Sequence, residues 1–391
     1  MEGNTAQSNT PIAPSNASSP AQSVPPQAPP PAEKPAGQRK LFAVIVAFLI
    51  LVIVAVLGVF YLLNINNQKM ETATTTLGNT LKIGLSLDTL AVARWTKDRD
   101  LMTFKAQHLG ASVVTLVANS DDNTQIAQIR NLIAQNVKVI IIVAHNAQAL
   151  SGVIDEAHQA GIKVIAYDRM ILNSDVDFYV SFDSVKVGSA AAEYVMAAVP
   201  KTIAVPNVAF VGGSPTDNNA MLVRQGAMGV LEPLVKAGKA KIVFDQYTDN
   251  WDPTVAYDNM DKFLNSGGKV DAVIASNDGT AGGVEKALAG HGLSGKVPLS
   301  GQDAELTAVK RLLAGTQTVT LYKPIASEAN KAIEVAIDLA DGKAPQTTGV
   351  TNNGKINVPS FLLDPTPITK NTINILIKDG FYTHRDIYGG N

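Results

Sequence analysis

The sequence predicts an α/β fold in which two similar lobes are each built on a doubly wound parallel sheet. From residue 81 onward, short apolar segments rich in Val, Ile and Ala alternate with longer helix-like segments. Such short segments are typical of strands buried on both faces, and their alternation with helices favours parallel pairing through right-handed crossovers. About nine such units exceed one compact domain, so we expect two lobes with a ligand cleft between them.

The predicted strands are short, often β-branched and nearly all apolar. They span residues 82–87, 113–118, 139–144, 163–167, 208–211, 241–245, 272–276, 297–300 and 318–322. The longer segments between them are predicted to be helices. These include residues 124–135, 148–160, 185–199, 219–237, 254–264 and 304–313.

The N-terminal part of the chain has a different composition from the folded part. Residues 1–38 consist largely of Pro, Ala, Ser, Gln and Asn, which cannot bury enough apolar surface to fold, so we predict a disordered tail. Residues 41–63 are uncharged and apolar, and a helix of that length would reach about 34 Å, enough to cross a bilayer. The run is too long for the apolar core of a signal peptide and lacks a convincing cleavage site. We therefore predict an uncleaved transmembrane anchor at 39–63, followed by a tether at 64–80.

Charges beside the apolar run predict its orientation. Lys34, Arg39 and Lys40 precede it, whereas only Lys69 lies close after it. Basic residues flank the cytoplasmic end of a span, so the tail is expected in the cytoplasm and the folded part outside, in the periplasm or at the cell exterior.

Composition excludes several classes of function. The net charge is −2 and no long basic run follows residue 40, so nucleic acid is not expected as a partner. The chain has no cysteine, which excludes disulfides, thiolate metal sites, a cysteine nucleophile and a lipid-modified N-terminal cysteine. No HExxH or GxSxG motif occurs, and the five histidines lack ligand spacing. Gly290-x4-Gly295-Lys296 resembles a phosphate loop, but Val297 follows it and it leads into a strand. We expect no metal, cofactor or enzymatic activity.

Polar or aromatic side chains follow most of the predicted strands directly. They are Arg94-Trp95, Asp168-Arg169, Asp217-Asn218-Asn219, Trp251, Asn277-Asp278, Gln302-Asp303 and Lys323. Ligands of parallel α/β sheets bind at the carboxyl ends of the strands. Carboxylate, amide, guanidinium and indole groups without a nucleophile–base pair suit a small polyhydroxylated molecule, so a sugar site is the leading hypothesis.

Each candidate residue also has an ordinary structural interpretation. Asp168 and Arg169 could form a local salt bridge, and Asp217, Asn277 or Asp303 could cap the helix that follows. Each tryptophan could simply cover the surface of a lobe. The recurrence of these residues at the same topological position favours a common site.

Several of these motifs together resemble a known family. The chain from Lys82 to about Phe381 is similar to the ribose/galactose-type periplasmic binding proteins of ABC sugar importers, and in particular to members that bind D-xylose. The stretches that carry the resemblance are Arg94-Trp95-x-Lys97-Asp98-Arg99-Asp100, Ala166-Tyr167-Asp168-Arg169-Met170, Phe178-Tyr179-Val180-Ser181-Phe182-Asp183, Gly212-Gly213-Ser214-Pro215-x-Asp217-Asn218-Asn219-Ala220, Ala275-Ser276-Asn277-Asp278, Ser300-Gly301-Gln302-Asp303-Ala304, Gly315-Thr316-Gln317-Thr318 and Tyr322-Lys323-Pro324-Ile325.

The resemblance implies a type I periplasmic binding protein fold with three crossings between the lobes, near Val185, Lys323 and Gly354. The lobes would comprise residues 81–185 plus 324–353, and residues 186–323 plus 354–391. The resemblance also implies a set of sugar contacts in which carboxylates accept hydrogen bonds from hydroxyls while Arg, Lys and Asn donate. The set is Arg94, Trp95, Asp168, Arg169, Asp217, Asn219, Trp251, Asn277, Asp303 and Lys323.

Two features depart from the family pattern. Family members are usually released by a cleaved signal, whereas this chain is expected to keep its span. Tyr247 stands where the xylose binders typically have another Trp, which would loosen specificity if the position lines the cleft.

The expected function is a membrane-tethered extracytoplasmic receptor that closes around D-xylose or a similar aldopyranose and delivers it to an ABC permease. The sugar-binding part is expected to be monomeric. The same lobes could instead report the sugar to a chemoreceptor or histidine kinase. A glycosidase using two of Asp168, Asp217 and Asp303 is disfavoured, because each has a ligand-orienting role.

Overall fold

The computed structural model describes residues 48, 50–62, 80–92 and 94–389. The predicted disordered tail, all but the last residue of the predicted tether, and residues 39–47, 49 and 63 of the predicted anchor lie outside these ranges. Residues 50–62 form a helix whose side chains are all exposed. Within the described ranges, we find no helix that is both long and apolar enough to cross a membrane.

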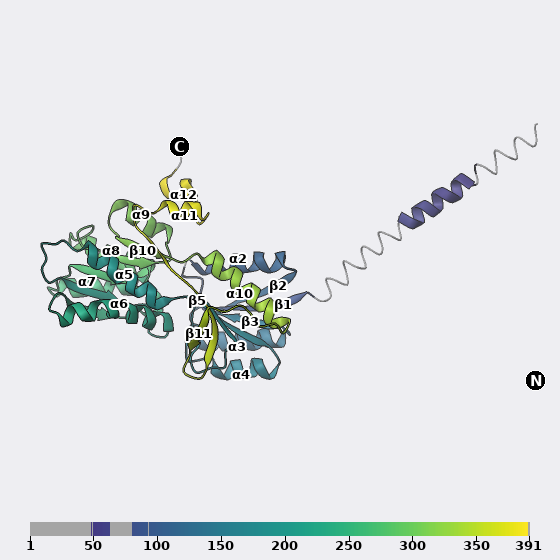
Figure 1. The fold of residues 1–391 in the computed structure, drawn as a ribbon, viewed down its shortest axis with the longest axis horizontal. Coiled ribbons are helices and arrows are strands. Elements are labelled where there is room, and N and C mark those ends of the chain that lie inside the picture. Colours follow the sequence, from purple (N-terminus) through teal and green to yellow (C-terminus); the bar gives the residue numbers. More distant parts are fainter. Residues whose placement is uncertain (1–47, 49, 63–79, 93, 390–391) are drawn as a thin grey trace, which may run out of the picture. The chain divides into compact units, whose positions relative to one another are not determined.

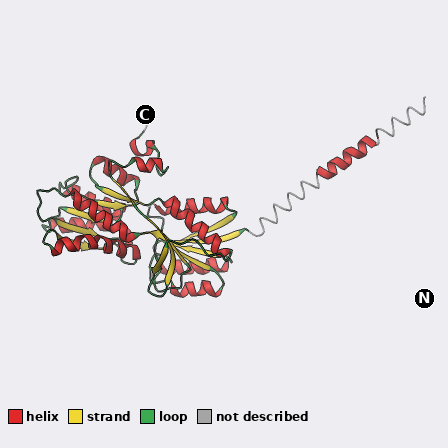
Figure 2. Ribbon diagram, in the orientation of Figure 1, coloured by secondary structure: helices red, strands yellow, loops and turns green. Residues whose placement is uncertain are grey.

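The first lobe is built on a seven-stranded sheet with the order β11-β12-β5-β4-β3-β1-β2. Its strands are β1 Leu81–Leu87, β2 Ala111–Val117, β3 Val139–Ile142, β4 Lys163–Tyr167, β5 Phe178–Phe182, β11 Gly349–Asn352 and β12 Asn357–Leu363. All pairs are parallel except the β11–β12 hairpin. One face packs on α2 (Arg94–His108) and α10 (Ile325–Ala340), the other on α3 (Asp122–Ala134) and α4 (Ser151–Gln159), as Figures 1 and 2 show.

The second lobe combines two three-stranded sheets, with the orders β7-β6-β8 and β13-β10-β9. A parallel bridge between Val273 and Leu299 joins them. The strands are β6 Asn207–Val211, β7 Lys241–Gln246, β8 Ala272–Ala275, β9 Ser300–Gln302, β10 Val319–Tyr322 and β13 Thr366–Ile368. The helices are α5 Ser184–Ala198, α6 Asn218–Lys236, α7 Pro253–Asn265, α8 Asp278–Gly290, α9 Leu306–Ala314, α11 Asn374–Lys378 and α12 His384–Tyr388, with a short 3-10 turn at Asp249–Trp251. The predicted α/β architecture with parallel sheets is confirmed.

The chain crosses between the sheets at three places, and one of them differs from the expectation. It leaves the first sheet after β5, near Val185 as expected, and returns after β10 at Lys323. The third crossing, expected near Gly354, lies instead at residues 364–365. The expectation was wrong because Gly354, with φ +93°, belongs to the β11–β12 hairpin, and β12 extends the first sheet by pairing in parallel with β5.

Two glycines allow α5 and α6 to pack with their backbones in contact. A Cβ atom on Gly226 of α6 would lie 2.0 Å from the carbonyl oxygen of Val185 in α5. A Cβ atom on Gly188 of α5 would lie 1.9 Å from the carbonyl oxygen of Val223 in α6. Neither backbone can yield without separating the helices, so glycine is required at both positions.

Gly226→Ala is therefore expected to lower the free energy of unfolding of the second lobe by about 1–3 kcal/mol, because the added methyl overpacks the helix contact. Gly229→Ala is the matched control in the same helix, since a Cβ atom there meets nothing within 4 Å. That control should raise helix stability by up to about 1 kcal/mol. Urea denaturation followed by circular dichroism measures both. Equal stabilities of the two variants would contradict the proposed packing constraint.

Candidate functional site

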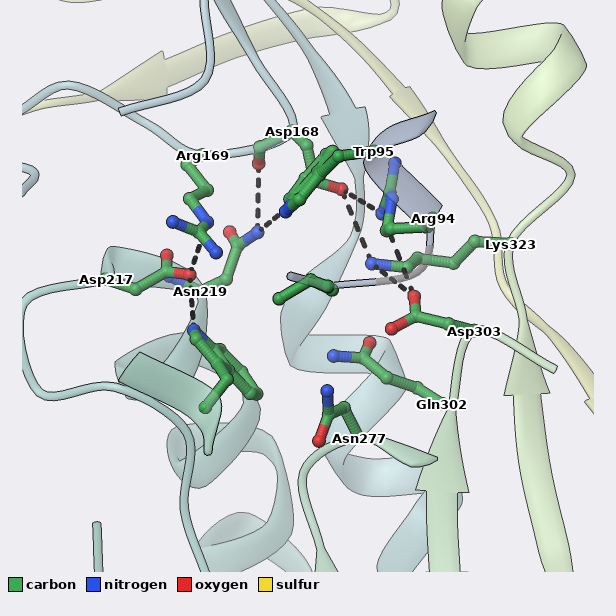
Figure 3. Close-up of a pocket in the computed structure, with 12 residues that line it drawn as sticks. Arg94, Trp95, Asp168, Arg169, Asp217, Asn219, Asn277, Gln302, Asp303 and Lys323 are labelled. Atoms are coloured by element: carbon green, nitrogen blue, oxygen red, sulfur yellow. Dashed lines mark hydrogen bonds and ion pairs between the residues drawn. The ribbon is translucent and has the colours of Figure 1, made fainter. Parts of the chain in front are cut away.

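A pocket lies where the carboxyl ends of the strands of both lobes meet. The segments that line it follow β1, β4, β6, β7, β8, β9 and β10. All ten residues predicted for the site line this pocket, as Figure 3 shows for most of them. The complete lining is Val92, Arg94, Trp95, Asp168, Arg169, Asp217, Asn219, Trp251, Asn277, Gln302, Asp303 and Lys323.

Arg94 is held by carboxylates on three sides. Its Nη1 lies 2.6 Å from Asp168 Oδ2, and its Nη2 lies 2.7 Å from Glu328 Oε2 of α10. Asp98, one turn along α2, accepts from Nε at 3.2 Å and from Nη2 at 3.1 Å. Burial would lower the pKa of Arg94, but the surrounding carboxylates raise it well above its usual range. Arg94 is therefore a fixed cation with its donors already directed.

Asp168 carries a negative charge at the centre of the pocket. Burial alone would raise the pKa of its carboxyl, but Arg94, then Lys323 and Arg169, lower it to about 2. Asn219 of the other lobe donates its Nδ2 hydrogens to Asp168 Oδ1 at 2.9 Å and to the Asp168 carbonyl oxygen at 3.0 Å. The backbone of Asp168 has φ +58°, a conformation that non-glycine residues rarely adopt. The neighbouring cations therefore fix the charge of Asp168, and Asn219 of the second lobe fixes its direction.

Arg169 links the two lobes through a second ionic pair. Its Nε lies 2.7 Å from Asp217 Oδ2 in the second lobe, while its Nη1 lies 2.7 Å from Asp88 Oδ2 in the first. Asp217 also accepts from Trp251 Nε1 at 3.1 Å and caps α6 through the backbone N–H of Asn219 at 2.9 Å. The helix-cap role foreseen for Asp217 is thus combined with its place in the pocket.

The two indoles are positioned by different means. Trp95 is almost completely buried and lies against the guanidinium of Arg94, 4.4 Å from the ring centroid. Trp251 has φ +57° and packs on Gly213, where a Cβ atom would come within 2.1 Å of the ring. Neither indole covers the outer surface of a lobe, so that interpretation of the two tryptophans is wrong.

The remaining polar residues come from the second lobe and its crossing strand. Asn277 caps α8, accepting from Thr280 N at 2.8 Å, and also lines the pocket. Lys323 Nζ lies 3.1 Å from Asp303 Oδ1 and 3.4 Å from Asp168 Oδ2. The cap interpretation is correct for Asn277, but it does not exclude a ligand contact.

Tyr247 does not line the pocket. Its ring packs against Gly212, and its hydroxyl donates to Met221 Sδ at 3.0 Å. Tyr247 was expected to loosen specificity only if it lined the cleft, and this condition is not met.

The carboxylates behind the pocket were not foreseen. Asp88, Asp98 and Glu328 hold the two arginines without lining the pocket. Asp98 also accepts a hydrogen bond from the Tyr167 hydroxyl. Sequence signals exist for two of the three carboxylates. Asp98 lies four residues after Arg94, and Glu328 interrupts the apolar face of a helix. In the described ranges, no group of three or more His, Asp or Glu side chains could hold a metal ion.

Comparison with known proteins identifies the family. A family model described as a periplasmic binding protein domain matches residues 83–344. A D-xylose-binding periplasmic protein of Haemophilus influenzae is 50% identical over 310 residues, covering 79% of this chain and 92% of the relative. The chain belongs to the periplasmic binding protein family.

Other relatives share this architecture. A D-xylose-binding periplasmic protein of Escherichia coli is 49% identical over 309 residues, covering 78% of this chain and 92% of the relative. A crystal structure of an ABC transporter solute-binding protein from Clostridium phytofermentans with bound β-D-glucose has a TM-score of 0.73 and 31% identity, and covers 78% of this chain and 99% of that chain. The family consists of binding proteins that catalyse no reaction, which confirms that this periplasmic binding protein is not an enzyme.

The ion pair between Asp88 and His145 in this periplasmic binding protein predicts a pH-dependent contribution to stability. His145 Nδ1 lies 2.9 Å from Asp88 Oδ1, and the hydrogen bond to Asp88 raises the pKa of His145. A raised pKa in the folded state means that the pair stabilises the protein fully below the unfolded pKa of about 6.5 and loses its effect as pH rises through the folded pKa. We expect His145→Gln to lower the melting temperature more at pH 5.5 than at pH 9. An equal loss at both pH values in thermal scans would contradict this linkage.

Proposed function

We propose that this periplasmic binding protein captures a neutral monosaccharide between its lobes, with D-xylose or a similar aldopyranose as the ligand. The observation that carries the proposal is the charge balance of the pocket. Three cations, Arg94, Arg169 and Lys323, face three carboxylates, Asp168, Asp217 and Asp303, and each charge is paired with another. Such a lining has no net charge to offer an ion, but it has directed donors and acceptors for hydroxyl groups.

Two polar atoms of the pocket support a hydroxylated ligand. Trp95 Nε1 and Asn219 Oδ1 are buried and have no hydrogen-bond partner in the described part of the chain. A buried polar group without a partner costs about 1–3 kcal/mol, so it favours a ligand that supplies the missing partner. A hydroxyl can accept from the indole N–H and donate to the amide oxygen. The flat indole faces suit the C–H groups of a pyranose ring.

Residues from both lobes contribute to these contacts, which supports capture by lobe closure. Arg169–Asp217 and Asp168–Asn219 each join the first lobe to the second. A ligand that bridges the same groups would favour the closed form. The D-xylose-binding names of the relatives support a pentose as ligand, and the family's role in ABC transport supports delivery to a membrane permease.

The decisive measurement is calorimetric titration of the full-length chain with D-xylose, other pentoses and hexoses. Trp95→Phe keeps an aromatic ring but removes the N–H donor, so affinity for the preferred sugar should fall by about 1–2 kcal/mol, or roughly five- to thirtyfold. Tyr247→Phe is the matched control, because it removes a hydroxyl from an aromatic ring outside the pocket, and it should bind as the wild type does. Absence of binding to every sugar of the panel would refute the proposed function, and equal affinities of the two variants would refute the role of Trp95.

We further propose that the chain is held in the membrane by residues 39–63. The support is the helix at residues 50–62, whose side chains are uncharged and exposed, including Phe60 at 69% and Leu51 at 68%. A helix that is apolar on every side is poorly suited to water and well suited to lipid. Tethering would keep the sugar-binding lobes close to a permease at high effective concentration.

The full-length chain is therefore expected to sediment with membranes and to resist alkaline carbonate extraction. A shortened chain that begins at Thr75 should be soluble and should bind the same sugar, because the folded part starts at Leu81. Protease added from outside should remove the lobes and leave a protected N-terminal fragment. Recovery of a soluble mature chain that starts just after residue 63 would show instead that the segment is a cleaved signal.

A further inference from the structure

Asp278 is a fully buried carboxyl directly beneath the pocket that does not line it. It is the first residue of α8 and follows the pocket residue Asn277. Its Oδ1 accepts from Gln317 Nε2 at 2.8 Å, and its Oδ2 accepts from Thr320 Oγ1 at 2.7 Å and from the backbone N–H of Glu305 at 2.9 Å. Three donors therefore converge on one buried carboxyl.

Two of these contacts hold a strained part of the pocket wall. Asp303 has φ +91° and Ala304 has φ +52°, so two consecutive non-glycine residues lie in a region that they rarely adopt. Such residues cost about 1–3 kcal/mol each and persist only where the surroundings fix them. Ala304 N donates to Thr320 Oγ1 at 3.1 Å, and the next amide, that of Glu305, donates to Asp278 itself.

The opposite side of the carboxyl is equally constrained. A Cβ atom on Gly301 in β9 would lie 2.0 Å from Asp278 Oδ1, so the carboxyl packs directly on the strand that leads to Gln302. Arg311 donates from Nε to Gln317 Oε1 at 2.8 Å, which turns Gln317 Nε2 toward Asp278. Arg311 Nη2 also donates to the Asp278 carbonyl oxygen at 2.7 Å.

We propose that Asp278 is a positioning residue of the sugar site, whose ionised carboxylate holds residues 302–305 so that Asp303 reaches Lys323 and Gln302 lines the pocket. The proposal rests on the proposed function and adds a control of affinity by pH. When Asp278 is protonated, its hydroxyl oxygen becomes a much weaker acceptor, and its O–H points toward groups that are themselves donors. The strained segment then loses one of its restraints, and the sugar site is less well organised.

The charges around Asp278 determine the pH range. Burial raises the pKa of Asp278 to about 8, the negative charge of Glu305 adds to the increase, and hydrogen bonds from Gln317 and Thr320 oppose it. The other titratable groups that face Asp278 are Arg311 of α9, which lowers its pKa, and Tyr382 of the C-terminal segment.

Affinity and stability are therefore expected to change in opposite directions with pH. Because the folded pKa is raised, the contribution of Asp278 to stability is fully present below the unfolded pKa of about 3.9 and is lost as pH rises through about 8. Sugar affinity should increase over the same rise, because the ionised form accepts all three hydrogen bonds. A purely structural role of Asp278 would not make sugar affinity and stability change in opposite directions with pH.

The test compares full-length wild type with Asp278→Asn, an isosteric change that cannot ionise, at pH 6.5 and pH 9.5. D-xylose and D-glucose titrations should show the variant binding the preferred sugar roughly three- to tenfold more weakly at pH 9.5, as expected for one lost hydrogen bond, and nearly as well as the wild type at pH 6.5. Asp271→Asn is the control, because Asp271 also accepts two hydrogen bonds in a partly buried setting, both from Asn207, but at the opposite end of β8. It should show no pH-dependent difference in affinity.

Hydrogen exchange of the Ala304 and Glu305 amides in the absence of sugar gives an independent readout. Exchange in Asp278→Asn should be faster than in the wild type at pH 9.5 and similar at pH 6.5. Thr320→Val removes the hydroxyl that connects the Ala304 amide to Asp278. It should accelerate exchange at Ala304 even if Asp278→Asn folds poorly.

Equal exchange in these variants and the wild type, or an affinity loss in Asp278→Asn that is the same at both pH values, would overturn the positioning role. If the wild type binds no sugar of the panel while exchange changes as expected, the proposed sugar function fails and the role of Asp278 in holding residues 302–305 stands.

Discussion

The site depends on one constraint: three buried cations and their carboxylates must be paired across two lobes. Arg169 shows this best, because its guanidinium joins Asp88 of the first lobe to Asp217 of the second while it lies inside the protein. A buried charge whose partner is removed costs several kcal/mol, so no member of the network can move alone. The residues of the pocket consequently present donors and acceptors in fixed directions.

Backbone strain accompanies this organisation. Asp168, Trp251 and Asp303 all line the pocket and all have positive φ. Each turns a side chain into the pocket at a strand end, and each is restrained by a neighbour: Asn219 for Asp168, Gly213 for Trp251, and the Asp278 network for the segment of Asp303. Backbone strain that the surrounding residues absorb is typical of a ligand-binding centre.

The strands rich in Val and Ile could be predicted from the sequence, because burial on both faces leaves an uninterrupted apolar run. The segment 163–167 matches β4 residue for residue, whereas 297–300 overlaps β9 only at Ser300. β5 and β12 were missed, since β5 contains two Phe, a Tyr and a Ser, and β12 contains Pro359. The third crossing was placed near Gly354 for the same reason. Because β12 was not predicted, the β11–β12 hairpin could not be assigned to the first sheet. Glu328 stands out as a break in the apolar face of its helix, but no local signal indicates that its partner is Arg94, 234 residues away.

The sequence by itself determined which residue types surround the pocket, because parallel strands that alternate with helices must bring their carboxyl ends to a common edge. The ten residues that the family resemblance selected all lie among the polar and aromatic residues that follow predicted strands, although the sequence left open whether several of them were only helix caps. The tertiary structure decided how these side chains pair, that Tyr247 lies outside the pocket, and that Asp88, Asp98 and Glu328 hold the arginines of the pocket from behind. Those decisions depend on distances between segments far apart in the chain, and local patterns of hydrophobicity and charge do not encode such distances.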